Sequence, residues 1–443
     1  MAGKWTVQGC EGEGAGVGWG RRMMNGFQYR RGELFCEGVA LRRLAKEFGT
    51  PLYVYSQGHV VGQYESLDRA LAGLDHLICC SVKANGNLGL VRAMANAGAG
   101  FDVVSGGELY RVVRAGGDPR RCVFAGVGKT REEIEYALRL GIYSFNVESE
   151  PELRRIGQVA RGMGRRAPIA IRVNPGVDPD THHYISTGKH GSKFGISIRH
   201  ALEVYREAAG MEGIEIRGVQ MHIGSQITKM GPFVLAIRKM TPLVERVRAL
   251  APGSLEFFDV GGGLGIRYRN ERPPTAGEFA RAVTPRLGRL GLRILFEPGR
   301  FIVGNGGVLL TRVAYVKQTP VKRFVIVDAA MNDLIRPALY GSYHEIAPVV
   351  RRGNGRRVTA DVVGPVCESG DFFAEGRRMA TVEEGELLAV MSAGAYGMAM
   401  ASNYNARPRP AEVLVNGGRY EVVRRRETAK DLVAGETVAA WLM

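Results

Sequence analysis

The chain has 443 residues, of which 45% are hydrophobic and 23% are charged; this length allows two domains, and this composition excludes a disordered chain. The net charge of +16 comes from short, scattered basic clusters without interleaved aromatic residues, and we therefore expect no nucleic-acid partner. The least polar long stretch, residues 387–401, is too short to cross a bilayer, so we expect no membrane association.

The first part of the chain, residues 1–23, is rich in glycine and carries no periodic apolar pattern, which predicts a flexible extension. Residues 24–48 include a strand-turn-strand pattern, Phe27–Val39, and we expect these strands to join a β domain formed later in the chain. Six cysteines without a C-x-x-C spacing indicate neither a zinc site nor a disulfide framework, and they favour a reducing, cytoplasmic location.

Residues 49–300 alternate short apolar runs with longer helical patterns, and most of the runs are rich in Val, Ile and Phe, as buried parallel strands are. An extra run, Pro51–Ser56, is followed by eight others: His76–Lys83, Gly100–Ser105, Arg121–Gly126, Tyr143–Glu148, Pro168–Pro175, Ile214–Ser225, Leu255–Gly261 and Arg293–Pro298. Eight strands with helical crossovers in roughly 250 residues predict a (β/α)8 barrel of the TIM type. The alternative, an open doubly wound sheet, lacks its G-x-G-x-x-G fingerprint here.

The pattern changes in residues 301–443, where short runs are separated by Gly, Pro and Asn turns. The runs are Val308–Val316, Arg323–Asp328, Arg357–Val363, Gly385–Met391, Glu412–Val415 and Arg419–Val423. They predict a C-terminal antiparallel β domain, with one helical segment near Asn332–Tyr340.

A barrel carries its active site at the C-terminal ends of its strands, so the last residue of each run is a candidate. Lys83 ends the first run, in an apolar setting where a charged amine is costly to bury. One interpretation is a lysine that extends out of the barrel mouth. The other is a lysine of depressed pKa that forms a Schiff base.

Three further run ends carry polar or glycine residues. Gly261, Gly262 and Gly263 follow the seventh run, where barrels commonly hold phosphate, although a tight turn explains them equally well. His222 follows the sixth run, and Glu297 with Arg300 follows the eighth. Together with Lys83, this set matches what pyridoxal 5'-phosphate needs: an amine for the aldehyde, a phosphate cradle, a flat ring and a carboxylate for the pyridine nitrogen.

The sequence resembles the fold type III pyridoxal phosphate-dependent decarboxylases and, within that group, the diaminopimelate decarboxylase family. The motifs that carry the resemblance are Ser81–Asn85, Tyr184–Gly188, Lys193–Gly195, His222–Ser225, Glu297–Arg300, Met331–Tyr340, Cys367–Asp371 and Ser402–Asn405. The resemblance implies decarboxylation of meso-2,6-diaminopimelate to L-lysine and CO2, the last step of lysine biosynthesis. It also implies a homodimer with shared active sites.

The resemblance assigns a role to each matching position. It implies that Lys83 forms the Schiff base, His222 stacks on the cofactor ring and Cys367, from the partner subunit, donates the proton. The other cofactor-binding residues that it implies are Ser225, Gly261, Gly262, Gly263, Glu297, Pro298, Gly299, Arg300 and Tyr396. The substrate-binding residues that it implies are Arg300, Arg336 and Tyr340 for the distal carboxylate and Glu368 for the distal ammonium, together with Tyr396.

Two other functions stay open on the sequence. An arginine or ornithine decarboxylase on the same fold would leave Arg300 and Arg336 unpaired, since its substrate has no distal carboxylate. A non-catalytic regulator that binds pyridoxal phosphate should have lost Lys83 or Cys367, and both are present. His182, His183 and His190 cluster in the sequence but follow no ligand spacing on a regular element, so we expect no metal.

Overall fold

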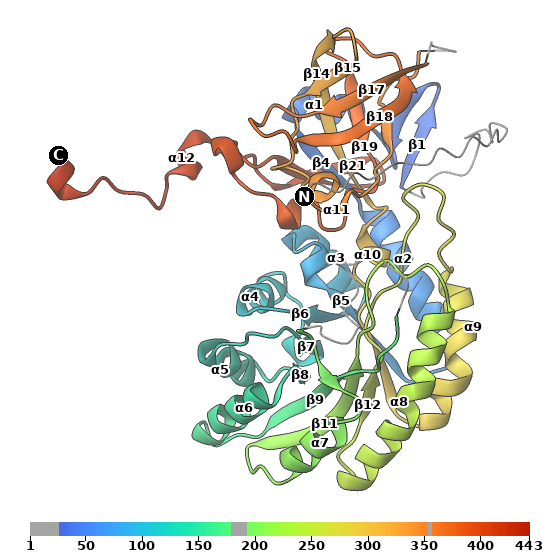
Figure 1. Cartoon of the computed structure of the whole chain (residues 1–443), viewed down its shortest axis with the longest axis vertical. Coiled ribbons are helices and arrows are strands. Elements are labelled where there is room, and N and C mark those ends of the chain that lie inside the picture. Colours follow the sequence, from blue (N-terminus) through green and yellow to red (C-terminus); the bar gives the residue numbers. More distant parts are fainter. Residues whose placement is uncertain (1–25, 179–192, 353–356) are drawn as a thin grey trace, which may run out of the picture.

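A computed structural model gives the structure of residues 26–178, 193–352 and 357–443 (Figure 1). The expected extension, residues 1–23, and the three clustered histidines lie outside these ranges. Two bodies are visible in Figure 1: strands flanked by helices, and a smaller β domain next to one end of them. Within the ranges given, no helix is long and apolar enough to span a membrane.

The barrel has eight parallel strands and is closed, because the last strand pairs with the first. The strands are β5 (His76–Ser81), β6 (Gly100–Val103), β7 (Cys122–Phe124), β8 (Ser144–Val147), β9 (Ala167–Asn174), β11 (Ile214–Met221), β12 (Phe257–Asp259) and β13 (Arg293–Phe296), with the short β10 (Ile196–Ser197) beside β9. The helices are α2 (Gln57–Ala70), α3 (Leu88–Asn96), α4 (Gly106–Arg114), α5 (Arg131–Leu140), α6 (Glu150–Gly162), α7 (Ala201–Ala209), α8 (Gly231–Leu250), α9 (Ala276–Leu287) and α10 (Arg300–Val303). The predicted barrel is confirmed.

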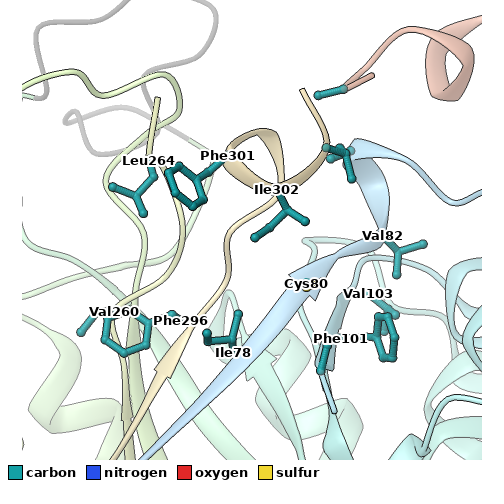
Figure 2. Packing of buried hydrophobic residues seen from close by; sticks show 14 of the residues in the cluster. Ile78, Cys80, Val82, Phe101, Val103, Val260, Leu264, Phe296, Phe301 and Ile302 are labelled. Atoms are coloured by element: carbon teal, nitrogen blue, oxygen red, sulfur yellow. The ribbon is translucent and has the colours of Figure 1, made fainter. Parts of the chain in front are cut away.

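Successive side chains along each barrel strand point alternately outward, toward the helices, and inward, into the barrel. Ile78, Cys80, Phe101 and Phe296 point outward and pack in the large core beneath the helices (Figure 2). The positions between them point into the barrel. At its lower level these form an apolar plug of Leu77, Cys79, Val123, Ala170, Phe257 and Leu295. Nearer the C-terminal ends of the strands, the inward-pointing positions carry polar side chains, all of them buried: Ser81, Asp102, Asn146, Gln220, Asp259 and Glu297.

The second domain is built around β14 (Gly307–Gln318), which pairs with β4 (Leu52–Ser56), β15 and β19. Its other elements are β15 (Arg323–Val327), α11 (Arg336–Tyr340), β16 (Ile346–Pro348), β17 (Arg357–Val363), β18 (Phe372–Ala380), β19 (Leu387–Val390), β20 (Ala411–Asn416), β21 (Arg419–Arg424) and α12 (Ala429–Leu432). Most pairs are antiparallel, as expected, but β15–β17 and β4–β20 are parallel, so the sheet is mixed.

The boundary between the domains differs from the expected residue 49. Strand β4 lies inside residues 49–300, yet it pairs with β14 and β20 of the second sheet. The chain leaves that sheet at Ser56 and returns to it at Gly307, and the Ser56 N–H donates to the Gly306 carbonyl at 2.8 Å. The barrel is therefore inserted between two neighbouring strands of the β domain.

The N-terminal strands β1 (Phe27–Arg30), β2 (Glu33–Cys36) and β3 (Val39–Ala40) form a small sheet of their own, followed by α1 (Leu41–Phe48). Phe27 and Leu34 share a hydrophobic cluster with Val54 and Val308, and the Leu34 N–H donates to the Val349 carbonyl at 2.8 Å. This sheet thus packs against the β domain instead of extending its main ladder.

Candidate active site

Lys83 lies in a short 3-10 turn (Val82–Ala84) directly after β5, at the mouth of the barrel. Its Nζ donates to Asp102 Oδ2 at 2.7 Å, and the Ser81 hydroxyl donates to the same oxygen at 2.7 Å. The Lys83 side chain is 35% exposed, whereas the Asp102 side chain is fully buried. The amine is thus anchored from below and accessible from the barrel mouth.

The pKa of Lys83 differs from the expected depressed value. Burial works to lower this pKa, but the carboxylates of Asp102 and Glu297 outweigh it and raise the pKa above its ordinary value. The expectation of a depressed pKa was wrong because it considered only the apolar strand before Lys83. Two acids from other strands, distant in the sequence, face the amine.

Glu297 is buried in the barrel, where its carboxyl meets amides and another acid. Asn146 Nδ2 donates to Oε1 at 2.9 Å, and Gln220 Nε2 donates to Oε2 at 3.2 Å. Burial, followed by the charges of Asp259 and Asp102, raises the pKa of Glu297 well above its usual range. Burial likewise raises the pKa of Asp259 to about 6. This cluster can hold a proton at neutral pH beside a basic nitrogen of a ligand.

Three buried oxygens in this cluster have no hydrogen-bond partner within the described ranges: Asp102 Oδ1, Asn146 Oδ1 and Gln220 Oε1. A buried acceptor without a partner is costly, and such groups collect where a ligand completes the bonding. The inward polar level of the barrel is therefore suited to a polar group that sits above the apolar plug.

The glycine loop after β12 is shaped by close backbone contacts. Gly261 has φ +72°, and a Cβ on Gly262 would lie 2.1 Å from the Glu297 carbonyl oxygen. The Gly261 N–H donates to Asp259 Oδ1 at 2.8 Å, and the Gly262 N–H donates to His222 Nδ1 at 3.2 Å. Of the three N–H groups expected to converge on phosphate, two are thus bonded within the chain.

The backbone N–H groups that remain available to bind an anion lie in that loop and beside it. Within the part of the chain that the structure describes, no acceptor bonds the backbone N–H of Gly263, Gly299 or Arg300. Pro298, which has no N–H, contributes its carbonyl to the Ser81 N–H at 3.1 Å. The loops after the seventh and eighth strands therefore share the candidate phosphate site.

His222 is half-buried beside the glycine loop, with its Nδ1 accepting from Gly262. Burial, with the nearby charges of Arg172 and Lys83, holds the pKa of His222 well below its usual range. The imidazole is therefore neutral at physiological pH, as a ring that stacks on an aromatic cofactor should be.

Two buried arginines meet above the mouth. Arg300 begins α10 of the barrel and Arg336 begins α11 of the β domain. Arg300 Nη1 and Arg336 Nη1 both donate to the Tyr268 hydroxyl, at 2.6 and 2.9 Å. Arg300 also donates to Ser225 Oγ at 3.2 Å and lies 4.8 Å from the centre of the Tyr396 ring. Tyr340 ends α11 and is partly buried. Two convergent guanidinium groups fit a carboxylate.

Cys367 and Glu368 lie elsewhere, on the loop between β17 and β18, where both are exposed. The Cys367 N–H donates to Asn405 Oδ1 at 2.7 Å, and the Tyr404 hydroxyl donates to Glu368 Oε2 at 3.5 Å. Across the described part of this single chain, no hydrogen bond or ion pair joins Cys367 or Glu368 to Lys83 or to the arginines.

Sequence reasoning missed three residues that the structure places in the site: Asp102, Tyr268 and His344. Asp102 had a usable signal, because an acid inside an otherwise apolar strand is rare without a buried partner. Tyr268 and His344 gave none, since both stand in irregular segments, and Tyr268 lies 32 and 68 residues from the two arginines that it contacts. The motif Tyr184–Gly188 lies outside the described residues; of Lys193–Gly195, the Gly195 N–H donates to Glu148 Oε2 at 2.9 Å.

Comparisons with known proteins identify the family of the chain. Residues 57–304 match the family described as "Pyridoxal-dependent decarboxylase, pyridoxal binding domain". The diaminopimelate decarboxylase of Pseudomonas aeruginosa is 54% identical over 415 residues, which cover 94% of this chain and 99% of that protein. The solved diaminopimelate decarboxylase of M. jannaschii in complex with L-lysine has a TM-score of 0.90 and 37% identity, covering 95% of this chain and 99% of that one. For the Helicobacter pylori enzyme complexed with L-lysine these values are 0.85, 41%, 89% and 98%. The chain belongs to the diaminopimelate decarboxylase family of pyridoxal-dependent decarboxylases.

Proposed function

We propose that the protein decarboxylates meso-2,6-diaminopimelate to L-lysine and CO2 with pyridoxal 5'-phosphate as cofactor, the last step of lysine biosynthesis. The observation that carries this proposal is the pair of buried arginines, Arg300 and Arg336, held on one hydroxyl at the mouth of a barrel that contains Lys83 and Glu297. The family to which the chain belongs supports it.

The residues present fit the cofactor. Lys83 would hold its aldehyde, the raised pKa of Glu297 suits a proton shared with the pyridine nitrogen, and neutral His222 can stack on the ring. The free N–H groups of Gly263, Gly299 and Arg300 suit the phosphate, and the Tyr396 ring, proposed to contribute to the same site, contacts the Arg300 guanidinium. When bound, the cofactor supplies an electron sink for the electron pair that remains when CO2 leaves.

The two arginines favour a substrate with a carboxylate at both ends. One end of meso-diaminopimelate reacts, and its other end presents a carboxylate, for Arg300, Arg336 and Tyr340, and an ammonium. Ornithine and arginine have no distal carboxylate and would leave both guanidinium groups buried without a counter-ion. The same reasoning separates this proposal from an arginine- or ornithine-type decarboxylase.

We also propose that the active enzyme is a homodimer in which the partner completes each site. The reaction needs a proton donor and a group for the distal ammonium, and Cys367 and Glu368 provide both chemistries from an exposed loop. A second copy that places this loop over the barrel mouth would also exclude water from it. The described cysteines are all free thiols, which supports a cytoplasmic location.

The activity is tested by loading the purified protein with pyridoxal phosphate and measuring CO2 and lysine formed from meso-diaminopimelate. Borohydride reduction followed by peptide mapping should place the pyridoxyl group on Lys83. Equal kcat/KM for ornithine, or a label on another lysine, would contradict the proposal. A regulator without catalytic function would bind the cofactor and release no CO2.

The shared site is tested by mixing chains that are each inactive. Lys83→Ala and Cys367→Ala chains are purified separately and allowed to exchange subunits. A mixed dimer has one native site, and random exchange makes about half of the dimers mixed, so roughly a quarter of native activity should return. If mass spectrometry confirms exchange and no activity returns, then Lys83 and Cys367 of one chain serve the same site.

A further inference from the structure

Tyr268 occupies a central position between the two arginines. It lies in the irregular segment between β12 and α9 and is buried. Its hydroxyl oxygen accepts from Arg300 at 2.6 Å and from Arg336 at 2.9 Å. Its ring also lies under both cations, with its centre 5.8 Å from the Arg300 guanidinium carbon and 4.8 Å from that of Arg336. One side chain therefore fixes the spacing of both guanidinium groups.

The Tyr268 hydroxyl uses its oxygen as an acceptor and leaves its own proton without a partner among the described residues. A phenol oxygen accepts two hydrogen bonds and donates one. The two arginines occupy both acceptor positions, and no acceptor for the hydroxyl proton exists among the residues that the structure describes. The proton therefore remains available, at the point where the two guanidinium groups meet.

His344 contacts the same Arg336 nitrogen, Nη1, that donates to Tyr268. His344 is fully buried, its Nδ1 lies 2.8 Å from the Met391 carbonyl and its Nε2 lies 3.0 Å from Arg336 Nη1. Burial and the charge of Arg336 lower the pKa of His344 to about 3, so the ring is neutral. The carbonyl can only accept, so Nδ1 carries the proton and Nε2 accepts from the arginine. Arg336 is thereby fixed between two acceptors.

We propose that Tyr268 is a specificity-determining residue, whose hydroxyl donates to the distal carboxylate of the substrate while its oxygen holds Arg300 and Arg336 apart at carboxylate spacing. This inference rests on the proposed function. The carboxylate then receives hydrogen bonds from two cations and one neutral donor, and a ligand without that carboxylate gains nothing from Tyr268.

The test uses the Tyr268→Phe holoenzyme, which keeps the ring beneath both guanidinium groups and removes only the hydroxyl. Two ligands separate recognition from general damage. L-Lysine retains the distal carboxylate, and 1,5-diaminopentane is the same molecule without it. Calorimetry should show a dissociation constant for L-lysine raised about 10- to 100-fold, as for loss of a hydrogen bond to a charged group. The dissociation constant for 1,5-diaminopentane should change less than about twofold.

Kinetics give a second readout, in which KM for meso-diaminopimelate rises while kcat changes little. The matched control is Tyr343→Phe, another tyrosine with arginines over its ring, Arg269 and Arg377, but outside the site. It should leave both ligands unaffected. Thermal melting checks that each variant folds.

The outcomes are distinct. Equal weakening of both ligands would mean that Tyr268 only supports the fold, and no weakening would mean that its hydroxyl does not touch the carboxylate; either overturns the inference while the proposed function stands. A wild-type holoenzyme that binds no L-lysine would overturn the proposed function and this inference with it.

Discussion

The barrel mouth and the loop between β17 and β18 carry the two halves of the proposed active site, and they differ in burial. At the mouth, Asp102, Glu297 and Arg336 are buried and form hydrogen bonds with neighbours from several separate segments of the chain. On the loop, Cys367 and Glu368 are exposed and held mainly through backbone contacts. The half proposed to bind the cofactor and the substrate carboxylate is thus buried and hydrogen-bonded within one chain, and the half proposed to supply the proton and to bind the distal ammonium is presented outward.

The largest effect should come from Lys83→Ala, which removes the amine of the barrel half. We expect kcat/KM for meso-diaminopimelate to fall by about 10³-fold or more, as for loss of a covalent catalytic group. The fold should persist, because Ser81 still donates to Asp102. Activity assays and thermal melting are the measurements. Substantial residual activity with a cofactor-saturated variant would contradict the role of Lys83.

Cys367→Ala should remove the proposed proton donor on the loop and leave the barrel mouth unchanged. We expect kcat to fall by about 10²- to 10⁴-fold, the range for loss of a general acid, while L-lysine binding and the melting temperature hardly change. Cys36→Ala is the control, because that thiol is buried in the β domain and should affect stability more than rate. A loss of lysine affinity equal to the loss of rate would place Cys367 in binding instead.

Arg336→Leu tests the ligand-binding side of the comparison. Loss of one partner of a buried charge pair costs about 2–5 kcal/mol in binding, so kcat/KM for meso-diaminopimelate should fall accordingly. Thermal stability should not fall in parallel, since the wild-type guanidinium is buried without a carboxylate partner in the described chain and its burial already lowers its pKa. An unchanged kcat/KM would exclude Arg336 from the carboxylate site.

His59→Leu should give the smallest of the expected effects, a change in stability at a buried residue that belongs neither to the barrel mouth nor to the loop. His59 is buried, neither ring nitrogen has a partner within the described ranges, and burial lowers its pKa to about 4. As pH falls below about 6.5, His59 binds a proton in the unfolded chain but not in the folded chain. The free energy of unfolding of the wild-type protein therefore falls. The gain from the variant should thus be about 1 kcal/mol larger at pH 5.5 than at pH 7.5 in urea unfolding. An equal gain at both pH values would contradict this.

Much of the barrel was predictable because its strands are buried on both faces and read as continuous apolar runs. The same property hid the place of β4, since five buried residues in Leu52–Ser56 fit a barrel strand and a sheet strand equally well. Strand β18 was not predicted because its middle is charged and exposed and its pairing with β17 is irregular.

In the candidate site, too, some residues could be proposed from the sequence and others could not. Lys83, Glu297 and the glycine loop could be proposed from the sequence because the ends of barrel strands converge, a rule that needs no tertiary contacts. Tyr268 and His344 depend on the packing of α11 and its following loop onto the barrel, which no local pattern encodes. The direction of the Lys83 pKa shift also depended on Asp102, one strand away.

The insertion of the barrel between β4 and β14 has a consequence for biosynthesis. Strands β1 to β4 leave the ribosome first, but β4 finds its ladder partners β14 and β20 only after the whole barrel has been made. The barrel is thus the first unit whose contacts are complete in the nascent chain, and the β domain closes last. Because the exit at Ser56 and the return at Gly307 are adjacent, a short peptide bridging them should release the β domain as an independent unit.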